Sequence, residues 1–263
     1  MNIRGRVHRL VTQGSSFRGT SVKWQSCHFA IVGDMHHEPA LTWAFNARPI
    51  MTIGDKRIVR SAAPEFRTPE LSDPPADVCW IDLRSEHERV DAAWLGEGWT
   101  RVHIDLVPGA AAVKPGTHAY DITEIDFGAM YIQMVARAQA GFARVVTAVA
   151  EAEGDVLVAC AGGRDRTGLV SAMLHDLAGW SREDILEDYR RTNDQGAGLS
   201  DAMVEAGIIS AEMLDRMPFD VDVEDLARAL DVIDQHGGTR RYLEQGGASA
   251  ATLDHLSLSL TTR

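Results

Sequence analysis

The sequence predicts an α/β domain with a central, mainly parallel β-sheet that is flanked by helices. The first indication is a short apolar run at 156–159, which is typical of a buried strand and is followed by a glycine-bearing turn and an apolar helical segment at 169–174. The second is a long amphipathic stretch, 127–149, that leads directly into this strand. Because strands and helices alternate in this way, we expect neighbouring strands to run parallel.

Length and composition bound the class of protein. The chain has 263 residues, 45% of them hydrophobic, which can fill the core of one large domain or two small ones. A formal net charge of −12 argues against general binding to nucleic acid or anionic membranes. Three cysteines without a pairing pattern indicate a reducing compartment, so we expect a cytoplasmic protein, with secretion lacking a signal peptide left open. No apolar run is long enough for a transmembrane helix, so we expect no stable membrane insertion. No metal-ligand spacing stands out. The sequence leaves the oligomeric state open.

Residues 1–40 differ from the rest of the chain. Basic residues precede the first acid, Asp34, and the apolar pattern is poor. A transit peptide shares this basic, acid-poor character. We favour two simpler interpretations, a disordered tail or a start codon placed too far upstream, with Met35 as the true start. We therefore expect the globular domain to comprise residues 41–263.

The strands expected before residue 107 place polar side chains at their carboxyl ends. A strand is expected at 56–60 and a buried one within 77–83, so that Asp82 lies at the end of the second. Open α/β sheets place their active sites at such ends. A further short strand is expected at 100–106, where Asp105 is a weaker candidate for the same reason.

Helices account for most of the remaining chain. Ser85 followed by Glu88 is typical of a capping box. We expect one long helix over 127–149 and a polar hinge at 193–200. The helices expected after the glycine-bearing turn cover 181–192, 202–217, 223–235 and 253–260.

The turn after the 156–159 strand contains the candidate catalytic residues. Cys160 ends the strand, and Arg166 follows six positions later, near the start of the helix. Glycine-rich loop amides and a helix N-terminus form an anion site, and such a field lowers a cysteine pKa from about 8.5 to roughly 3.5–7.5. A thiolate can then attack phosphorus while an arginine fork holds two phosphate oxygens. The alternative is a buried structural cysteine, but the glycines and polar residues of this turn favour a cysteine-dependent phosphatase. The expected phosphate-binding residues are Ala161, Gly162, Gly163, Arg164, Asp165, Arg166 and Thr167.

The segment Cys160–Gly168 resembles the HCxxGKDRTG signature of a family of atypical bacterial protein tyrosine phosphatases, typified by the mycobacterial protein tyrosine phosphatase B. Its C-x-x-G-x-D-R-T core is also similar to that of phosphoinositide phosphatases such as the myotubularins. Departures are Ala159 in place of histidine, Arg164 in place of lysine and Pro49 in place of aspartate. The resemblance covers roughly 41–260, through segments similar to the family's N-x-R-D, R-S-A-x-P, I-D-L-R-S and D-Y motifs at 46–49, 60–64, 81–85 and 188–189.

This resemblance implies a cysteine-phosphatase-like three-layer domain with extra C-terminal helices. It also implies hydrolysis of a phosphate monoester through a cysteinyl-phosphate on Cys160. Arg166 and the loop amides would hold the phosphate oxygens, and Thr167 would hydrogen-bond the sulfur. Such a reaction requires neither a metal nor an organic cofactor.

Two carboxylates compete for the role of general acid. Asp82 holds the position proposed for this role in the bacterial family, although a carboxylate there can instead pair with Arg84 or cap a turn. Asp165 has this role in the similar myotubularin loop, but its neighbours Arg164 and Arg166 favour its ionised form. We therefore favour Asp82.

The substrate stays open among several classes. Resemblance to the tyrosine phosphatases implies a phosphotyrosine protein as the substrate, with phosphoserine and phosphothreonine (a dual-specificity enzyme) and phosphoinositides as alternatives. The basic Arg164 favours the phosphoinositides, because an inositol carries several phosphates. A different class of function is a catalytically weak phosphate-binding module, which Ala159 in place of histidine would suit.

Overall fold

The computed structural model describes residues 41, 43–66, 73, 75–88, 98–106, 126–195, 197–205, 209–212 and 220–258. The predicted tail at 1–40 lies outside the described residues, as does most of the second half of the helix expected at 202–217.

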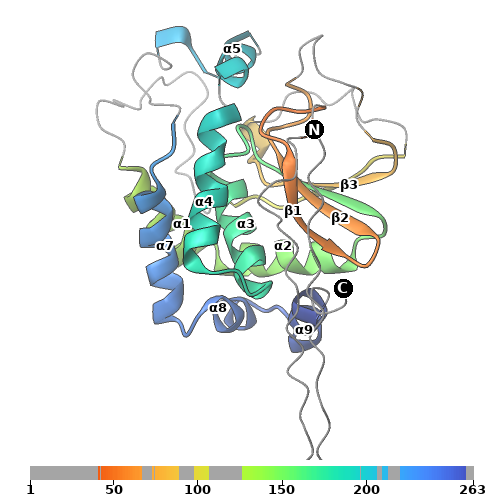
Figure 1. The fold of residues 1–263 in the computed structure, drawn as a ribbon, viewed down its shortest axis with the longest axis vertical. Coiled ribbons are helices and arrows are strands. Elements are labelled where there is room, and N and C mark those ends of the chain that lie inside the picture. Colours follow the sequence, from red (N-terminus) through yellow and green to blue (C-terminus); the bar gives the residue numbers. More distant parts are fainter. Residues whose placement is uncertain are drawn as a thin grey trace, which may run out of the picture. The chain divides into compact units, whose positions relative to one another are not determined.

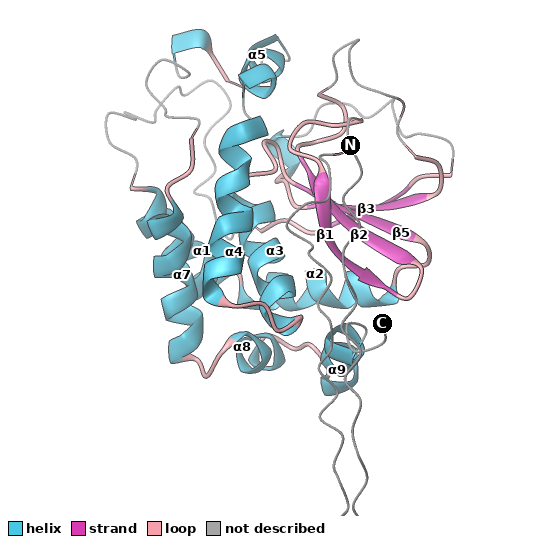
Figure 2. Ribbon diagram, in the orientation of Figure 1, coloured by secondary structure: helices cyan, strands magenta, loops and turns pink. Residues whose placement is uncertain are grey.

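Five strands of the described chain form a single sheet, in the order β1-β2-β5-β3-β4 (Figure 2). The β1–β2 pair is antiparallel, whereas the pairs β2–β5, β5–β3 and β3–β4 are parallel, which confirms the predicted mainly parallel sheet. The strand β1 was not predicted; it is joined to β2 through a turn at Gly54, whose φ of +59° suits glycine. The strands are β1 (Arg48–Ile53), β2 (Lys56–Ser61), β3 (Val78–Asp82), β4 (Thr100–His103) and β5 (Asp155–Ala159).

The central strand β5 positions the glycine-bearing turn. It pairs with β2 on one side and β3 on the other, so that Ala159 lies beside Ser61 and Asp82. All three residues are at the carboxyl ends of parallel strands, which brings the three following loops to one edge of the sheet.

The helices follow the predicted order, with three corrections. The helix α5 begins at Ala197, inside the polar hinge that was expected at 193–200, and α8 was not predicted. The single helix expected at 127–149 is two helices that meet at Ala138, whose backbone (φ −104°, ψ 18°) leaves the α-helical region. The two apolar faces have different partners, since α1 packs against α7 while α2 packs against the sheet, α8 and α9. The helices are α1 (Phe127–Arg137), α2 (Gln139–Glu151), α3 (Asp165–Leu177), α4 (Arg182–Arg190), α5 (Ala197–Glu205), α7 (Val223–Gln235), α8 (Thr239–Gln245) and α9 (Ala250–Leu258), with short 3₁₀ turns at Glu86–Glu88 and Arg191–Gln195. Within the described ranges, no helix has the length and apolar character needed to cross a bilayer.

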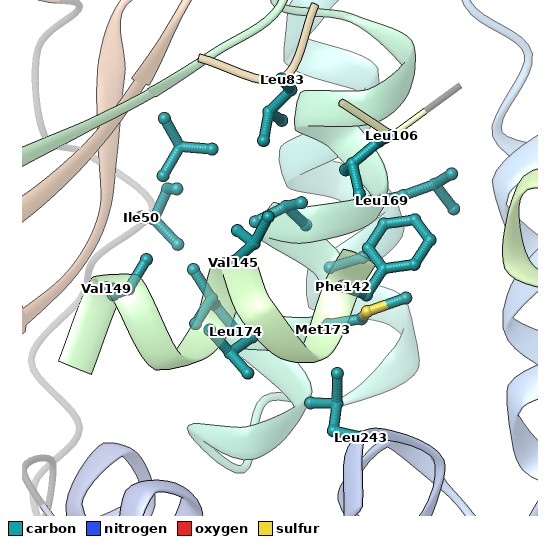
Figure 3. Close-up of a cluster of buried hydrophobic side chains, with 14 of the residues drawn as sticks. Ile50, Leu83, Leu106, Phe142, Val145, Val149, Leu169, Met173, Leu174 and Leu243 are labelled. Carbon is teal, nitrogen blue, oxygen red and sulfur yellow. The ribbon is translucent and has the colours of Figure 1, made fainter. Parts of the chain in front are cut away.

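The main hydrophobic core lies between the sheet and the helices α2 and α3. Figure 3 shows Phe142, Val145 and Val149 of α2 close to Leu169, Met173 and Leu174 of α3, with Ile50 of β1 in the same cluster. Beyond α4, α7 covers this helical layer on the side away from the sheet (Figure 1). The other face of the sheet carries a smaller cluster that includes Trp43, Trp80 and Trp99. Strand alternation separates the two, because Val156 and Val158 join the first cluster and Leu157 the second.

A buried histidine in α3 couples this core to pH. The side chain of His175 is 1% exposed and stacks on Trp180 with ring centroids 4.0 Å apart. Its Nε2 lies 3.0 Å from the carbonyl oxygen of Ile50, whereas its buried Nδ1 has no hydrogen-bond partner among the described residues. Burial, together with the charges of Arg60 and Arg48, lowers the pKa of His175 to about 4.

We predict that this histidine makes the protein less stable as the pH falls from about 6.5 towards 4. The unfolded chain takes up a proton near the ordinary histidine value of 6.5, but the folded chain does so only near 4, so protons favour unfolding between these values. The free energy of unfolding, measured in urea, should fall by roughly 2–3 kcal/mol more in the wild type than in His175→Gln between pH 7 and 4.5. The exposed His255→Gln is the control and should behave as wild type. Equal pH dependence in wild type and His175→Gln would contradict the prediction.

Candidate functional site

The side chain of Cys160 lies at the carboxyl end of β5, directly before the turn into α3. It is 1% exposed, and its backbone N–H donates a 2.9 Å hydrogen bond to Oγ1 of Thr167. The hydroxyl of Ser171 donates in turn to the carbonyl of Thr167, at 2.8 Å. These hydrogen bonds connect the end of β5 with the first turns of α3. No hydrogen bond between Thr167 and the sulfur is found among the described residues, where one was predicted.

The carbonyl groups of the turn are held from outside it. The N–H of Ala63 donates to the carbonyl of Ala161 at 2.9 Å. The carbonyl of Gly163 accepts two hydrogen bonds of 2.8 Å, from Nδ2 of Asn46 and Nη2 of Arg60. In a trans peptide the C=O and the following N–H point in opposite directions. Each fixed carbonyl therefore turns the next N–H of the loop away from these anchors.

Only glycine fits at position 163. Its φ is +64°, and a Cβ on its backbone would lie 2.4 Å from the carbonyl carbon and oxygen of Ser61. The turn thus rests directly on the end of β2, and the predicted close approach of backbone to backbone is present.

The first turn of α3 adds N–H groups to the loop that receive no side-chain cap from the N-cap residue. The helix begins at Asp165, and its N-cap residue, Arg164, makes no side-chain capping bond. The first backbone bond of this helix runs from the N–H of Gly168 to the carbonyl of Arg164, at 2.8 Å. A helix start with uncapped N–H groups carries partial positive charge. Together with the turned loop amides it forms an anion-binding cradle.

The guanidinium of Arg166 is held by Glu88. Its Nη1 and Nη2 donate to the two carboxylate oxygens, at 2.6 and 2.5 Å. Burial opposes the ionisation of both groups, but their pairing lowers the pKa of Glu88 and raises that of Arg166. An arginine has five N–H groups, so this end-on pair leaves Nε–H and the second N–H of Nη2 side by side on the other edge. That edge has the geometry to bind two oxygens of a phosphate.

A buried ionic cluster lies behind the turn and consists of Arg48, Arg60 and Asp188, the last from α4. Arg48 donates through Nε to Oδ1 of Asp188 at 2.8 Å, and Arg60 through Nη1 to Oδ2 at 3.2 Å. Arg48 also binds the side-chain oxygen of Asn46, and Arg60 reaches the carbonyl of Gly163. The cluster thus connects α4 and the first two strands to the turn.

The charges of this cluster do not cancel. Burial would raise the pKa of Asp188, but the two guanidiniums hold it far below its ordinary value. Burial and the neighbouring Arg48 lower the pKa of Arg60 to about 10, which still leaves it charged at neutral pH. Two arginines therefore face one carboxylate, and the excess positive charge lies behind the turn, where it favours a bound anion.

Asp165, the first residue of α3, lies at the end of the turn and accepts two hydrogen bonds through one carboxylate oxygen. Its Oδ1 accepts from Nε of Arg164 at 3.0 Å and from the hydroxyl of Tyr131 at 2.5 Å. Arg164 is 7% exposed, and its guanidinium lies 4.7 Å from the ring centroid of Phe127. This arginine is turned back onto the protein.

The other acid candidate, Asp82, is fully buried in a separate ionic cluster. Arg84 donates to both of its oxygens, at 2.9 and 3.1 Å, and Arg101 also pairs with it. Burial opposes its ionisation, but these arginines hold the pKa of Asp82 below its ordinary value. By strand alternation Asp82 points to the face of Trp80, whereas Cys160 belongs to the opposite cluster. This geometry does not favour the predicted acid role of Asp82; it matches the alternative of a carboxylate paired with Arg84.

Three residues of the site were assigned other roles from the sequence. Glu88 was expected to cap a helix, and it does accept from the N–H of Ser85 at 2.9 Å, but it also holds Arg166. Tyr131 was assigned to an apolar stripe. Asp188 was noted only within a D-Y motif. Only for Tyr131, which lies between the apolar Met130 and Ile132, does the sequence offer a local signal, and nothing in the sequence names the partners of these three residues.

The sequence of this chain is similar to those of known proteins. Residues 52–262 match the model of the family described as "Tyrosine phosphatase family". A tyrosine-protein phosphatase of Nostoc commune is 29% identical over 161 residues, which are 55% of this chain and 54% of that protein. The triple specificity protein phosphatase PtpB of Mycobacterium tuberculosis is 32% identical over 133 residues, which are 45% of this chain and 48% of that protein. The chain thus spans about half the length of these curated relatives. Because the family model matches most of its 263 residues, from 52 to 262, the chain belongs to the tyrosine phosphatase family.

Proposed function

We propose that this protein hydrolyses phosphate monoesters, and phosphotyrosine in proteins in particular, through a cysteinyl-phosphate intermediate. The observation that carries the proposal is the turn at 160–166, where fixed carbonyls turn the amides one way and Glu88 holds Arg166 so that two N–H groups lie together on its other edge. Both named relatives are phosphatases, which supports the same reaction class. We assign the phosphatase domain to residues 41–263.

In the first step the thiolate of Cys160 attacks phosphorus. The S–P bond forms as the P–O bond to the leaving group breaks, and charge on the equatorial oxygens is balanced by the loop amides and the free edge of Arg166. These groups are already fixed by other parts of the protein, so little reorganisation is needed when the charge develops.

In the second step water attacks the cysteinyl-phosphate. The S–P bond breaks, inorganic phosphate is released and the thiolate is restored. The carboxyl that gave its proton to the leaving oxygen in the first step takes a proton from this water, so that proton transfers balance over one turnover.

We assign that carboxyl to Asp165. It lies at the start of α3, one residue before Arg166, and its Oδ2 accepts no hydrogen bond from any described residue. Asp82, with both oxygens bound by arginines, we assign to holding β3 and β4 together.

The contacts of Arg164 support one substrate class over the other. A second phosphate-binding group is what a phosphoinositide would need, but this arginine pairs with Asp165 and packs on Phe127. A phosphotyrosine protein requires no second phosphate site, and we propose it as the substrate.

We also propose a cytoplasmic location. Cys79 and Cys160 are both free thiols, which supports a reducing compartment.

Replacing the nucleophile should separate binding from turnover. We expect Cys160→Ser to abolish phosphate release from a phosphotyrosine peptide, because the hydroxyl keeps the shape but not the thiolate, while peptide binding persists. Arg166→Ala should lose both, since the bidentate contact is missing. Phosphate release and calorimetric binding measure the two effects. Release by Cys160→Ser at the wild-type rate would refute the proposal, and a wild type that binds but never turns over would support a phosphate-binding module.

Leaving-group dependence should identify the acid. A poor leaving group needs a proton, whereas the nitrophenolate of para-nitrophenyl phosphate departs without one. We expect Asp165→Asn to slow hydrolysis of a phosphotyrosine peptide about 10²-fold or more, and of para-nitrophenyl phosphate much less, with a flattened alkaline limb of the pH–rate profile.

The matched variant for this test is Asp82→Asn. This substitution should lower the melting temperature, because it removes the charge that pairs with Arg84 and Arg101. The alkaline limb of the pH–rate profile of the folded enzyme should stay as in the wild type. If Asp82→Asn flattens the limb and Asp165→Asn does not, the two roles are exchanged.

Substitution of Arg164 tests the substrate class. Because its observed contact is with Asp165, we expect Arg164→Ala to reduce kcat by a similar factor on a phosphotyrosine peptide and on a polyphosphorylated inositide. Arg190→Ala removes an exposed arginine of α4 that pairs with Glu187; it serves as the control and should change neither activity. A selective loss on the inositide would instead favour phosphoinositides as the substrate.

A further inference from the structure

Two buried tyrosines and Asp165 form a continuous chain of hydrogen bonds. The hydroxyl of Tyr189, in α4, lies 2.6 Å from that of Tyr131, in α1. The hydroxyl of Tyr131 lies 2.5 Å from Oδ1 of Asp165. The chain therefore runs from α4 through α1 to the first residue of α3.

The direction of these bonds follows from the groups present. An ionised carboxylate can only accept, so the single proton of the Tyr131 hydroxyl is donated to Asp165. The Tyr189 hydroxyl must then donate to Tyr131. Burial and the neighbouring Asp165 raise the pKa of both tyrosines, so both remain protonated donors at neutral pH.

The chain is held in place by close packing. The two rings meet edge to face, with centroids 6.5 Å apart at an angle of 75°. A Cβ at Gly168 would lie 2.7 Å from the ring of Tyr189, so this glycine provides the space for the ring beside α3. Tyr131 is 1% exposed, and its hydroxyl has little freedom to leave Asp165.

We infer that Tyr131 is a positioning residue for Asp165. By its hydrogen bond, Tyr131 determines which carboxylate oxygen of Asp165 carries the transferred proton. Tyr131 and Arg164 donate to the same oxygen, Oδ1, and no described residue donates to Oδ2. An oxygen that accepts two hydrogen bonds is a poor site for a proton, so the proton resides on Oδ2. The inference rests on the proposed function, in which Asp165 is the general acid.

The consequence for the reaction is specific. The Oδ2–H bond breaks as the proton passes to the leaving oxygen, and Tyr131 stabilises the carboxylate that results by donating to Oδ1. In the second step Oδ2 takes a proton from the attacking water. Tyr131 itself transfers no proton and contacts neither phosphorus nor sulfur in this account.

The test removes the hydroxyl alone. We expect Tyr131→Phe to reduce kcat on a phosphotyrosine peptide about tenfold, the effect of one hydrogen bond to a charged group, with KM unchanged. On para-nitrophenyl phosphate the loss should be less than about twofold, because this leaving group needs no proton. The alkaline limb should move to higher pH, since the carboxylate loses a donor. The control is Tyr242→Phe, whose equally buried hydroxyl donates to the carbonyl of Val135, also in α1, at 2.7 Å.

A double-mutant cycle gives the outcome that decides the inference. If Tyr131 acts through Asp165, Tyr131→Phe should have almost no effect in the Asp165→Asn background. An undiminished loss in that background, or equal losses on both substrates with an unmoved alkaline limb, would overturn the inference while leaving the phosphatase proposal intact. A wild-type protein that releases no phosphate from either substrate would refute the proposed function, and the positioning role with it.

Discussion

The carbonyl oxygen of Gly163 accepts hydrogen bonds from Asn46 and Arg60, which lie 117 and 103 positions away in the sequence. This contact fixes the peptide plane at the centre of the turn and thus the direction of the next N–H. The turn can take this path only because position 163 has no Cβ to meet the backbone of Ser61. The anion cradle therefore depends on the end of β2 as much as on its own residues.

Holding a carbonyl with a buried guanidinium has an energetic consequence. A charge removed from water is costly unless it is paired, and Arg60 and Arg48 share the single carboxylate of Asp188. Within the described part of the chain one carboxylate thus serves two buried guanidiniums, and an anion on the other side of the turn would compensate the remaining positive charge. Because the buried guanidiniums cannot turn away to solvent, their positive charge favours an anion at the turn.

The division of the helical segment 127–149 at Ala138 has a functional consequence. It lets α2 pack along the sheet while α1 turns towards α7 and places Tyr131 against Asp165. A single straight helix would present its whole apolar face in one direction. The acid candidate on the turn is consequently supported by α1 and α4, whereas Cys160, the proposed nucleophile, is supported by the strands.

The sequence by itself determined the local structure around the turn, namely the buried strand, the glycine-bearing loop and the helix that follows. It also determined the bounds 223–235 of α7, because apolar periodicity and glycine placement are local signals. It also indicated that Cys160 and Arg166 share one loop. Only the tertiary structure decided which side chains meet across the chain, since periodicity marks a buried face but does not name its partner. Asp82 is the clearest example: its position at a strand end follows from the sequence, but its side chain points to the face opposite Cys160, between Arg84 and Arg101. Likewise Glu88 pairs with Arg166, 78 positions away, because the segments that follow β3 and β5 begin at the same edge of the parallel sheet.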